Sequence, residues 1–161
     1  MKLVRELIKG EGLSVGKIIK VNDRSIDSVT ELAMKLWPDN DYQELKEEFA
    51  KMLHTDNNKV FLYLVDGNPI GFAHFSIRTD YVEGSDSSPI GYIEGIYVEA
   101  EYRRQGVSKE LLAKGEQWVR EKGYSEIASS CEYDNTTSYH FHKGIGFKEA
   151  NRIICFIKDI R

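Results

Sequence analysis

Hydrophobic and polar residues repeat along the chain with a spacing that predicts two helices near its start. Apolar residues recur at steps of three and four over residues 26–36 and again over 42–53, with Pro38 between the two runs. Spacing of this kind places the apolar side chains on one face of a helix. Asn40 or Asp41 stands where the second helix would begin and is a candidate cap. We therefore expect a pair of amphipathic helices.

Strand-like runs follow the predicted helix pair. Residues 60–65 and 70–78 are rich in apolar and aromatic residues, and a turn-rich sequence separates them, which predicts a hairpin. A polar loop at 83–89 contains too much Gly, Ser and Asp to continue a sheet. The strand pattern resumes at 92–98 and includes Gly95. This third strand is expected to be irregular, because glycine inside a strand often marks a bulge.

The remaining pattern alternates between helix and strand. A helix is predicted over 111–119 and is stopped by Gly123. A strand at 126–130, a short helix after Asn135 and a last strand at 152–158 complete the chain. Hairpin strands followed by alternating helices and strands predict an α/β fold whose mixed sheet has antiparallel and parallel parts.

The chain has the length of one domain. Its 161 residues match the rough size of about 150 residues per domain, and we assign residues 17–161 to a single domain. Residues 1–16 carry a short amphipathic run that is closed by Gly10, Gly12 and Gly16. They are predicted to form an N-terminal arm.

Charge and cysteine content narrow the classes of partner. The chain has 22 basic and 26 acidic residues and a net charge of -4, which argues against a nucleic-acid binder and favours cationic partners. The two cysteines, Cys131 and Cys155, have no paired spacing and no neighbouring base, so they are expected to be inert. No signal-peptide pattern and no membrane-spanning apolar run stands out. We expect a protein of the reducing cytoplasm without membrane partners.

The most specific chemical signal lies at residues 103–109, between a predicted strand and a predicted helix. Gly106 allows the backbone to approach a ligand closely. The N–H groups at the helix start, together with Arg103 and Arg104, form an anion site suited to a pyrophosphate. The alternative is an ordinary helix start flanked by two solvated arginines.

This turn resembles the coenzyme A signature of the GNAT acetyltransferases, which reads Gln or Arg, two variable residues, Gly, one variable residue, then Gly or Ala. Arg103, Gly106 and Ser108 hold those places, and Ser108 departs from the signature while remaining small. The resemblance implies the GNAT fold and acetyl-CoA as co-substrate, without a metal. The cofactor-binding residues that it implies in this turn are Arg103, Arg104, Gln105, Gly106, Val107, Ser108 and Lys109.

The strand before the turn resembles the splayed strand of that family. Gly95 is well placed for a bulge. The resemblance implies that Ile96, Tyr97 and Val98 offer backbone groups to the pantetheine arm, as in strand addition. An amide near Ile96 or Tyr97 would polarise the thioester carbonyl.

A later segment matches the second coenzyme segment of the family through Asn135, Ser138, His142, Gly146 and Phe147. It implies that Asn135 and Ser138 bind the cofactor. His142 stands where the family commonly has an aromatic hydroxyl residue. It could protonate the leaving thiolate, since imidazole titrates near neutrality, or it could pack against the strand. His140 and His142 point to different helix faces and do not read as metal ligands.

A narrower resemblance covers residues 25–158 and is similar to the aminoglycoside 6'-N-acetyltransferases. It rests on 36–38, 76–84, 87–89 and 94–98. It implies acetyl transfer to the 6'-amine of aminoglycoside antibiotics, which confers resistance. Because that family often dimerises through its last strands, it also implies a homodimer through residues 152–158.

The acceptor side needs a base and a place for cations. An amine with a pKa of about 10 must lose a proton before it attacks, and Glu94 is the candidate base, with an outward-facing strand glutamate as the alternative. Trp37 and Tyr81 are candidate substrate contacts, although Tyr81 could instead pack from loop to core. A carboxylate-rich loop formed by Asp80, Glu83 and Asp86 could hold further ammonium groups or could simply be solvated.

One departure bears on the substrate. The aminoglycoside group has an aspartate, thought to contact the substrate, where this chain has Ser130, and Glu132 could compensate only if the strand end bends it inward. Ser130 favours a first alternative, an N-acetyltransferase for a polyamine, another small-molecule amine or a protein amine. A second alternative is a coenzyme A-binding module without catalysis, against which Glu94 and the phosphate turn argue.

Overall fold

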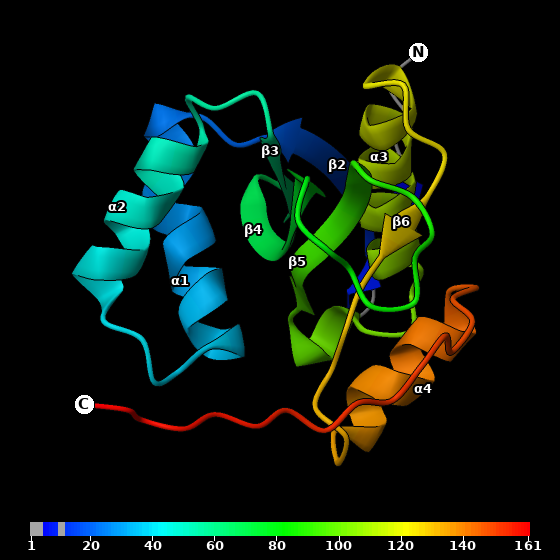
Figure 1. The fold of residues 1–161 in the computed structure, drawn as a ribbon. Helices are drawn as coiled ribbons and strands as arrows, with labels where there is room; N and C mark the ends of the chain where they lie inside the picture. The colour runs from blue at the N-terminus through cyan, green and yellow to red at the C-terminus, as the bar shows by residue number, and fades with distance from the viewer. Residues whose placement is uncertain (1–4, 10–11) are drawn as a thin grey trace.

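The computed structural model describes the backbone of residues 5–9 and 12–161 and the side chains from residue 16 onwards. These described residues form a six-stranded sheet whose strands lie in chain order (Figure 1). Neighbouring strands from β1 to β5 are antiparallel, and β5 and β6 are parallel. The mixed sheet predicted from the sequence is confirmed. The strands are β1 (Arg5–Lys9), β2 (Gly12–Lys20), β3 (Asn58–Val65), β4 (Asn68–Arg78), β5 (Ile90–Val98) and β6 (Ile127–Ala128).

Helices cover both faces of the sheet. In Figure 1, α1 and α2 lie on one side of the strands and α3 lies on the other, with α4 below it. The apolar stripe of each amphipathic helix is buried by this arrangement. The helices are α1 (Ile26–Leu36), α2 (Tyr42–Met52), α3 (Val107–Glu121) and α4 (Thr136–Gly144), with short 3-10 turns at η1 (Asp23–Ser25) and η2 (Ala100–Tyr102).

The predicted helix pair and hairpin are confirmed. Asp41 caps α2, because its Oδ1 accepts hydrogen bonds from the amides of Gln43 and Glu44 at 2.9 and 3.0 Å. The turn between β3 and β4 has positive φ at both Asp66 (49°) and Gly67 (84°), as in the two-residue turns that match the twist of a hairpin.

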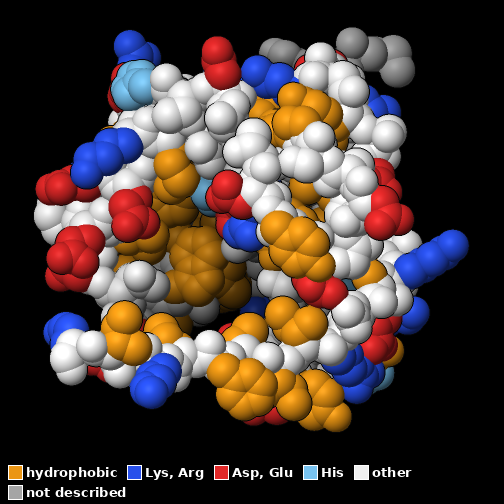
Figure 2. All heavy atoms as spheres, in the orientation of Figure 1, with side chains coloured by type: hydrophobic (Ala, Val, Ile, Leu, Met, Phe, Trp, Pro, Cys, Tyr) orange, Lys and Arg blue, Asp and Glu red, His pale blue; other side chains and the backbone are white. Residues whose placement is uncertain are grey.

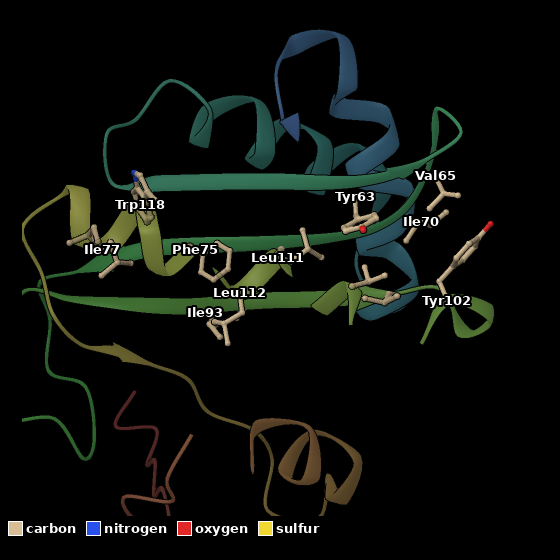
Figure 3. Close-up of a cluster of buried hydrophobic side chains, with 14 residues drawn as sticks. Tyr63, Val65, Ile70, Phe75, Ile77, Ile93, Tyr102, Leu111, Leu112 and Trp118 are labelled. Atoms are coloured by element: carbon tan, nitrogen blue, oxygen red, sulfur yellow. The ribbon is translucent and has the colours of Figure 1, made fainter. Parts of the chain in front are cut away.

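The core between the sheet and α3 is unusually close at one point. Figure 3 shows its apolar side chains, among them Phe75 and Ile93 from the sheet and Leu111 and Leu112 from α3. A Cβ atom built on Gly115 would lie only 2.2 Å from the ring of Phe75. Glycine at this position therefore allows the helix to lie directly on the aromatic ring, and it fixes how near α3 comes to the sheet.

The structure differs from the sequence prediction at the N-terminal arm. Residues 5–9 and 12–16 are strands of the sheet, and β2 runs through residue 16, where the arm was expected to end. Gly12 and Gly16 lie inside this strand instead of terminating an element, because β2 continues unbroken from its pairing with β1 to its pairing with β3. The remainder of the predicted arm, residues 1–4, 10 and 11, lies outside the described residues.

The predicted last strand is wrong for this chain. Residues 152–158, all described, form no strand, and the expected strand at 126–130 shrinks to the two residues of β6. A strand needs a neighbouring edge with which to exchange hydrogen bonds, but this segment runs away from β6 beneath the molecule (Figure 1). Its apolar side chains are consequently exposed, Ile154 at 81% and Phe156 at 91%. Among the described helices, none is long and apolar enough to cross a membrane.

Candidate active site

A bulge in β5 creates the polar centre of the molecule. His74 pairs with Gly95 and Phe75 pairs with Ile93, so Glu94 is the extra residue. A bulge interrupts the strict alternation of side chains, and here it places Glu94 and Gly95 on the same face, toward α1 and α2. A Cβ at Gly95 would lie 2.5 Å from Trp37, so that indole lies directly beside the bulge. The bulge expected at Gly95 is confirmed.

Glu94 is held by side chains of the neighbouring strand. Ser76 Oγ donates to its Oε1 at 2.5 Å, and Arg78 donates from Nε to Oε1 at 2.9 Å and from Nη2 to Oε2 at 2.6 Å. Burial raises the pKa of the Glu94 carboxyl, but the hydrogen bonds from Arg78 and Ser76 and the charge of Arg78 outweigh it, and the pKa lies below its ordinary value. Glu94 is therefore ionised at neutral pH.

A chain of contacts joins this carboxylate to Ser130. The Arg78 guanidinium lies 3.5 Å from the centroid of the Tyr92 ring, a distance typical of cation–π stacking. Tyr92 Oη lies 2.6 Å from Ser130 Oγ. Ser130 thus acts on Glu94 only through Tyr92 and Arg78, and it brings no negative charge of its own.

His74 lies on the same face of β4 and is buried. Its Nε2 is 2.8 Å from Asn58 Oδ1, and its ring packs edge-on against Phe49 of α2. Burial lowers the pKa of His74 from its ordinary value of 6.5 to about 4. The imidazole is therefore neutral at physiological pH. The cation that pairs with Glu94 is Arg78.

This face of the molecule is hollowed. Figure 2 shows a depression with a hydrophobic floor between the helix pair and the strands, with acidic and basic atoms at its upper rim and the C-terminal segment below it. Trp37 and Phe72, whose ring centroids are 6.0 Å apart, belong to the apolar cluster on this side of the sheet. Such a concave apolar surface with a few convergent polar groups suits a small ligand.

The phosphate turn has the geometry of an anion site. Gly106 adopts φ 84° immediately before α3, and no side chain in the described chain caps this helix start. Its first amide N–H groups also lack partners within the helix. Arg104 has φ 60° and is exposed. Arg103 instead turns back, because its Nε donates to the carbonyl of Val98 at 2.9 Å. The backbone amides and Arg104 can therefore bind a pyrophosphate.

An open strand edge leads from this turn toward the bulge. β6 pairs with β5 only at Gly91 and Tyr92, and beyond Tyr92 no strand of the described chain pairs with this edge. The amide of Glu99 bonds to the carbonyl of Ile70, so the register turns the backbone groups of Tyr97 toward β4 and those of Ile96 and Val98 toward the open edge. Because Arg103 already occupies the Val98 carbonyl, the free groups offered to an extended ligand are centred on Ile96. A cavity of about 370 Å³ between α3 and α4 adjoins the helix start, where Lys109 is part of its lining.

The polar side chains of the second coenzyme segment mostly form hydrogen bonds within the protein. Asn135 caps α4, because its Oδ1 accepts from the amide of Ser138 at 2.9 Å. His142 Nε2 lies 2.8 Å from Ser129 Oγ, and its Nδ1 lies 2.7 Å from the carbonyl oxygen of Ser138. Both nitrogens of His142 are thus engaged in joining α4 to the end of β6. This geometry favours the packing interpretation of His142.

The acidic loop and the C-terminal segment touch. Tyr81 is 79% exposed and its hydroxyl donates to Glu83 at 2.7 Å. Glu83 also accepts from Asn151 at 2.5 Å. Tyr81 does not pack into the core, so the loop-to-core interpretation is wrong. Glu132 is exposed, and the strand end does not bend it inward.

The sequence predictions miss the residues that support Glu94. The patterns single out none of Ser76, Arg78 and Tyr92 as a functional side chain, and they give His74 no catalytic context. The alternation of His74, Ser76 and Arg78 along β4 could have shown that they share a face. The partner across the strand could not be read, since the bulge shifts the register by one residue. In the part of the chain that the structure describes, no group of three or more His, Cys, Asp or Glu side chains could hold a metal ion.

The site has two parts. The open strand edge and the helix start suit a carrier that bears phosphate groups, and the ionised carboxylate beside the apolar hollow suits a cationic second ligand. Residues 26–147 match the Acetyltransferase (GNAT) family, and the chain belongs to that family. The fold and the N-acetyltransferase class expected from the sequence are thereby confirmed.

Known proteins resemble the chain over most of its length. The Aminoglycoside N(6')-acetyltransferase type 1 of Salmonella typhimurium is 38% identical over 141 residues, which cover 88% of this chain and 97% of that protein. The protein of the same name from Stenotrophomonas maltophilia is 37% identical over 127 residues, 78% of this chain and 82% of its own.

Two solved structures have the same fold. The structure of AAC(6')-Iy in complex with CoA has a TM-score of 0.87 and 36% identity, and the match covers 94% of this chain and 99% of that one. The complex of AAC(6')-Iy with the bisubstrate analogue CoA-S-monomethyl-acetylneamine has a TM-score of 0.85 and 36% identity, with coverage of 89% and 98%.

Proposed function

We propose that the protein transfers the acetyl group of acetyl-CoA to the 6'-amine of aminoglycoside antibiotics. The observation that carries the proposal is the ionised Glu94 on the β5 bulge, next to Trp37 and adjacent to the open strand edge. The similarity to several aminoglycoside N(6')-acetyltransferases supports the choice of acceptor. Acetyl-CoA, when bound, supplies the thioester that the amine attacks.

The donor side is assigned to the backbone around β5 and α3. Amides of residues 104–109 and the charge of Arg104 hold the pyrophosphate, because the helix start has positive polarity and no side-chain cap. The open edge at 96–98 holds the pantetheine arm. The backbone N–H of Ile96, which faces the open edge, donates to the carbonyl oxygen as it gains negative charge. The residues therefore fit the coenzyme without a further side chain.

The acceptor side is assigned to the hollow. Glu94, directly or through a water that it orders, binds the ammonium and takes its proton before the nitrogen forms its bond to the acetyl carbon. Trp37 provides an apolar wall, and Tyr81 and Glu83 contact the acceptor from the loop. The transfer is direct, so no covalent intermediate on the protein is needed. His142 receives no proton-transfer role, since both of its nitrogens are engaged.

The first test is thiol release from acetyl-CoA with kanamycin or tobramycin as acceptor, beside spermidine and a lysine peptide, with product masses measured. Turnover and the gain of one acetyl group at the 6'-amine are expected for the aminoglycosides. Turnover with spermidine or the peptide alone would keep the enzyme class and move the acceptor to another amine, the alternative that Ser130 favours. Coenzyme binding without any turnover would leave a non-catalytic module.

The role of Glu94 is tested by Glu94→Gln. We expect kcat to fall by about 100-fold or more, which is the usual contribution of a positioned base. Binding of acetyl-CoA should stay within about 2-fold, because Glu94 does not line the phosphate turn. Unchanged turnover across the pH range would refute the assignment.

We further propose a homodimer of the reducing cytoplasm. The exposed apolar side chains of the C-terminal segment, residues 148–161, need a covering surface, and a second copy offers the edges of its own sheet at β1 and β6, which pair with no further strand of the described residues. Both cysteines are exposed and unpaired, as in reducing compartments. Light scattering after size exclusion should give a dimer, and Phe156→Asp should give a monomer. A wild-type monomer at micromolar concentration would overturn the proposal.

A further inference from the structure

Arg78 is a cation already seated on the carboxylate that the acceptor ammonium must reach. It contacts both oxygens of Glu94 and stacks on the ring of Tyr92. The pair is only partly shielded, since the Arg78 side chain is 39% exposed and that of Glu94 is 23% exposed. The guanidinium thus contacts Glu94 and the ring of Tyr92, and the rest of its surface is open to solvent.

The hydrogen-bonding capacity of Glu94 is nearly used up. An ionised carboxylate has about four lone-pair sites, and the hydrogen bonds from Ser76 and Arg78 occupy three of them. One site remains on Oε2. An ammonium group has three donors and the same positive charge as Arg78. It therefore cannot pair fully with Glu94 while the guanidinium stays in place.

The surroundings give the guanidinium another position. Asp80 lies two residues further along the chain, is exposed, and its charge acts on Arg78. Tyr92, on which Arg78 stacks, is fixed by its contact with Ser130. A guanidinium displaced from Glu94 would still have the charge of Asp80 and the ring of Tyr92 in its surroundings. The other titratable group that acts on Glu94, His74, is neutral and does not compete.

We propose that Arg78 occupies the ammonium subsite of Glu94 in the resting protein and is displaced by the acceptor, so that it sets a threshold of affinity that weakly bound amines do not pass. The inference rests on the proposed function, in which Glu94 faces the acceptor. Displacement costs the same for every amine. Only an acceptor with additional contacts in the hollow and on the acidic loop overcomes that cost at low concentration.

Calorimetry with CoA present tests the threshold with tobramycin, which carries several amines, and glucosamine, which carries one. Arg78→Gln should bind both probes more tightly, by the same factor of about 5, because the competing cation is lost. Arg78→Lys keeps the charge but loses the two-point contact, so its gain should be smaller. Arg120→Gln, which removes a cation paired with Glu116 on the outside of α3, should change neither affinity.

A second readout separates displacement from a structural role. Carbon NMR of Glu94 in the acceptor-free protein should show its titration midpoint rising in Arg78→Gln, because the hydrogen bonds and charge of Arg78 lower the pKa of Glu94. Equal or weaker amine binding by a folded Arg78→Gln protein, or an unmoved midpoint, overturns the inference. If the wild type acetylates no aminoglycoside but Arg78→Gln binds both amines more tightly, the proposed acceptor fails and the threshold stands. If the wild type acetylates tobramycin but Arg78→Gln binds neither amine more tightly, the threshold fails and the proposed acceptor stands.

Discussion

The two candidate sites along β5 differ in the groups that form them. Where β5 leads into α3, the candidate anion site consists of backbone amides that Gly106 and an uncapped helix start place in the open. At the bulge, Glu94 depends on the side chains of Ser76 and Arg78, and through Arg78 on Tyr92. A backbone site survives most substitutions, because every residue except proline has a backbone N–H. A side-chain network changes its charge and shape when one member changes.

Ser130 belongs to the side-chain network of the acceptor side, whereas Gly106 belongs to the backbone site of the donor side. The hydroxyl of Ser130 can hold Tyr92, but it cannot attract an ammonium as a carboxylate would. A substitution on the acceptor side can therefore change how the protein binds its second ligand without loss of the donor side. Three substitutions would break or sharpen this contrast.

The largest effect is expected at the donor side from Gly106→Glu. The substitution forces a side chain into φ 84° and puts a negative charge where a pyrophosphate binds. We expect coenzyme A affinity to fall by about 1000-fold or beyond detection in calorimetry. Gly123→Glu is the matched control, since Gly123 has φ 91° at the other end of α3 and nothing near it. Wild-type affinity in Gly106→Glu would refute the placement of the phosphate site.

A smaller effect, on stability, is expected at the acceptor side. The pKa of His74 is lowered to about 4 in the folded protein, so the unfolded chain takes up its proton first as the pH falls. The contribution of His74 to the free energy of unfolding is fully present above about pH 6.5. It falls by about 3 kcal/mol as the pH drops toward 4. Urea titrations of His74→Gln should show a pH dependence that is weaker by this amount. An identical pH dependence in both proteins would mean that the imidazole is not desolvated.

The smallest effect is expected from Ser130→Asp. The added carboxylate lies beside the hydroxyl of Tyr92, on whose ring Arg78 stacks, and it attracts a polycation. KM for tobramycin should fall by about 5-fold at low salt, and the gain should shrink as salt is added. Thr137→Asp adds the same charge at an exposed position of α4 and should leave KM unchanged. A salt-independent or absent gain would show that position 130 does not face the acceptor.

The sequence predicted what depends on local pattern. Periodicity located the helix pair, and glycine at 95 and 106 marked the bulge and the turn. Gly106 adopts a positive φ, and Gly95 leaves room for the ring of Trp37 beside the bulge. The contacts of Arg78 with Glu94 were out of reach, since they depend on a register that the bulge shifts. Residues 152–158 carry a strand-like apolar run, but a strand also needs a partner edge, and this segment does not lie along β6.

The close contact at Gly115 extends the site beyond the residues that line it. A larger side chain there would push α3 away from Phe75 and carry the helix start at Val107 with it. In a screen of random variants scored by coenzyme retention, position 115 would rank with the phosphate turn although it meets no ligand. The distance between α3 and the sheet therefore also determines how well the coenzyme binds.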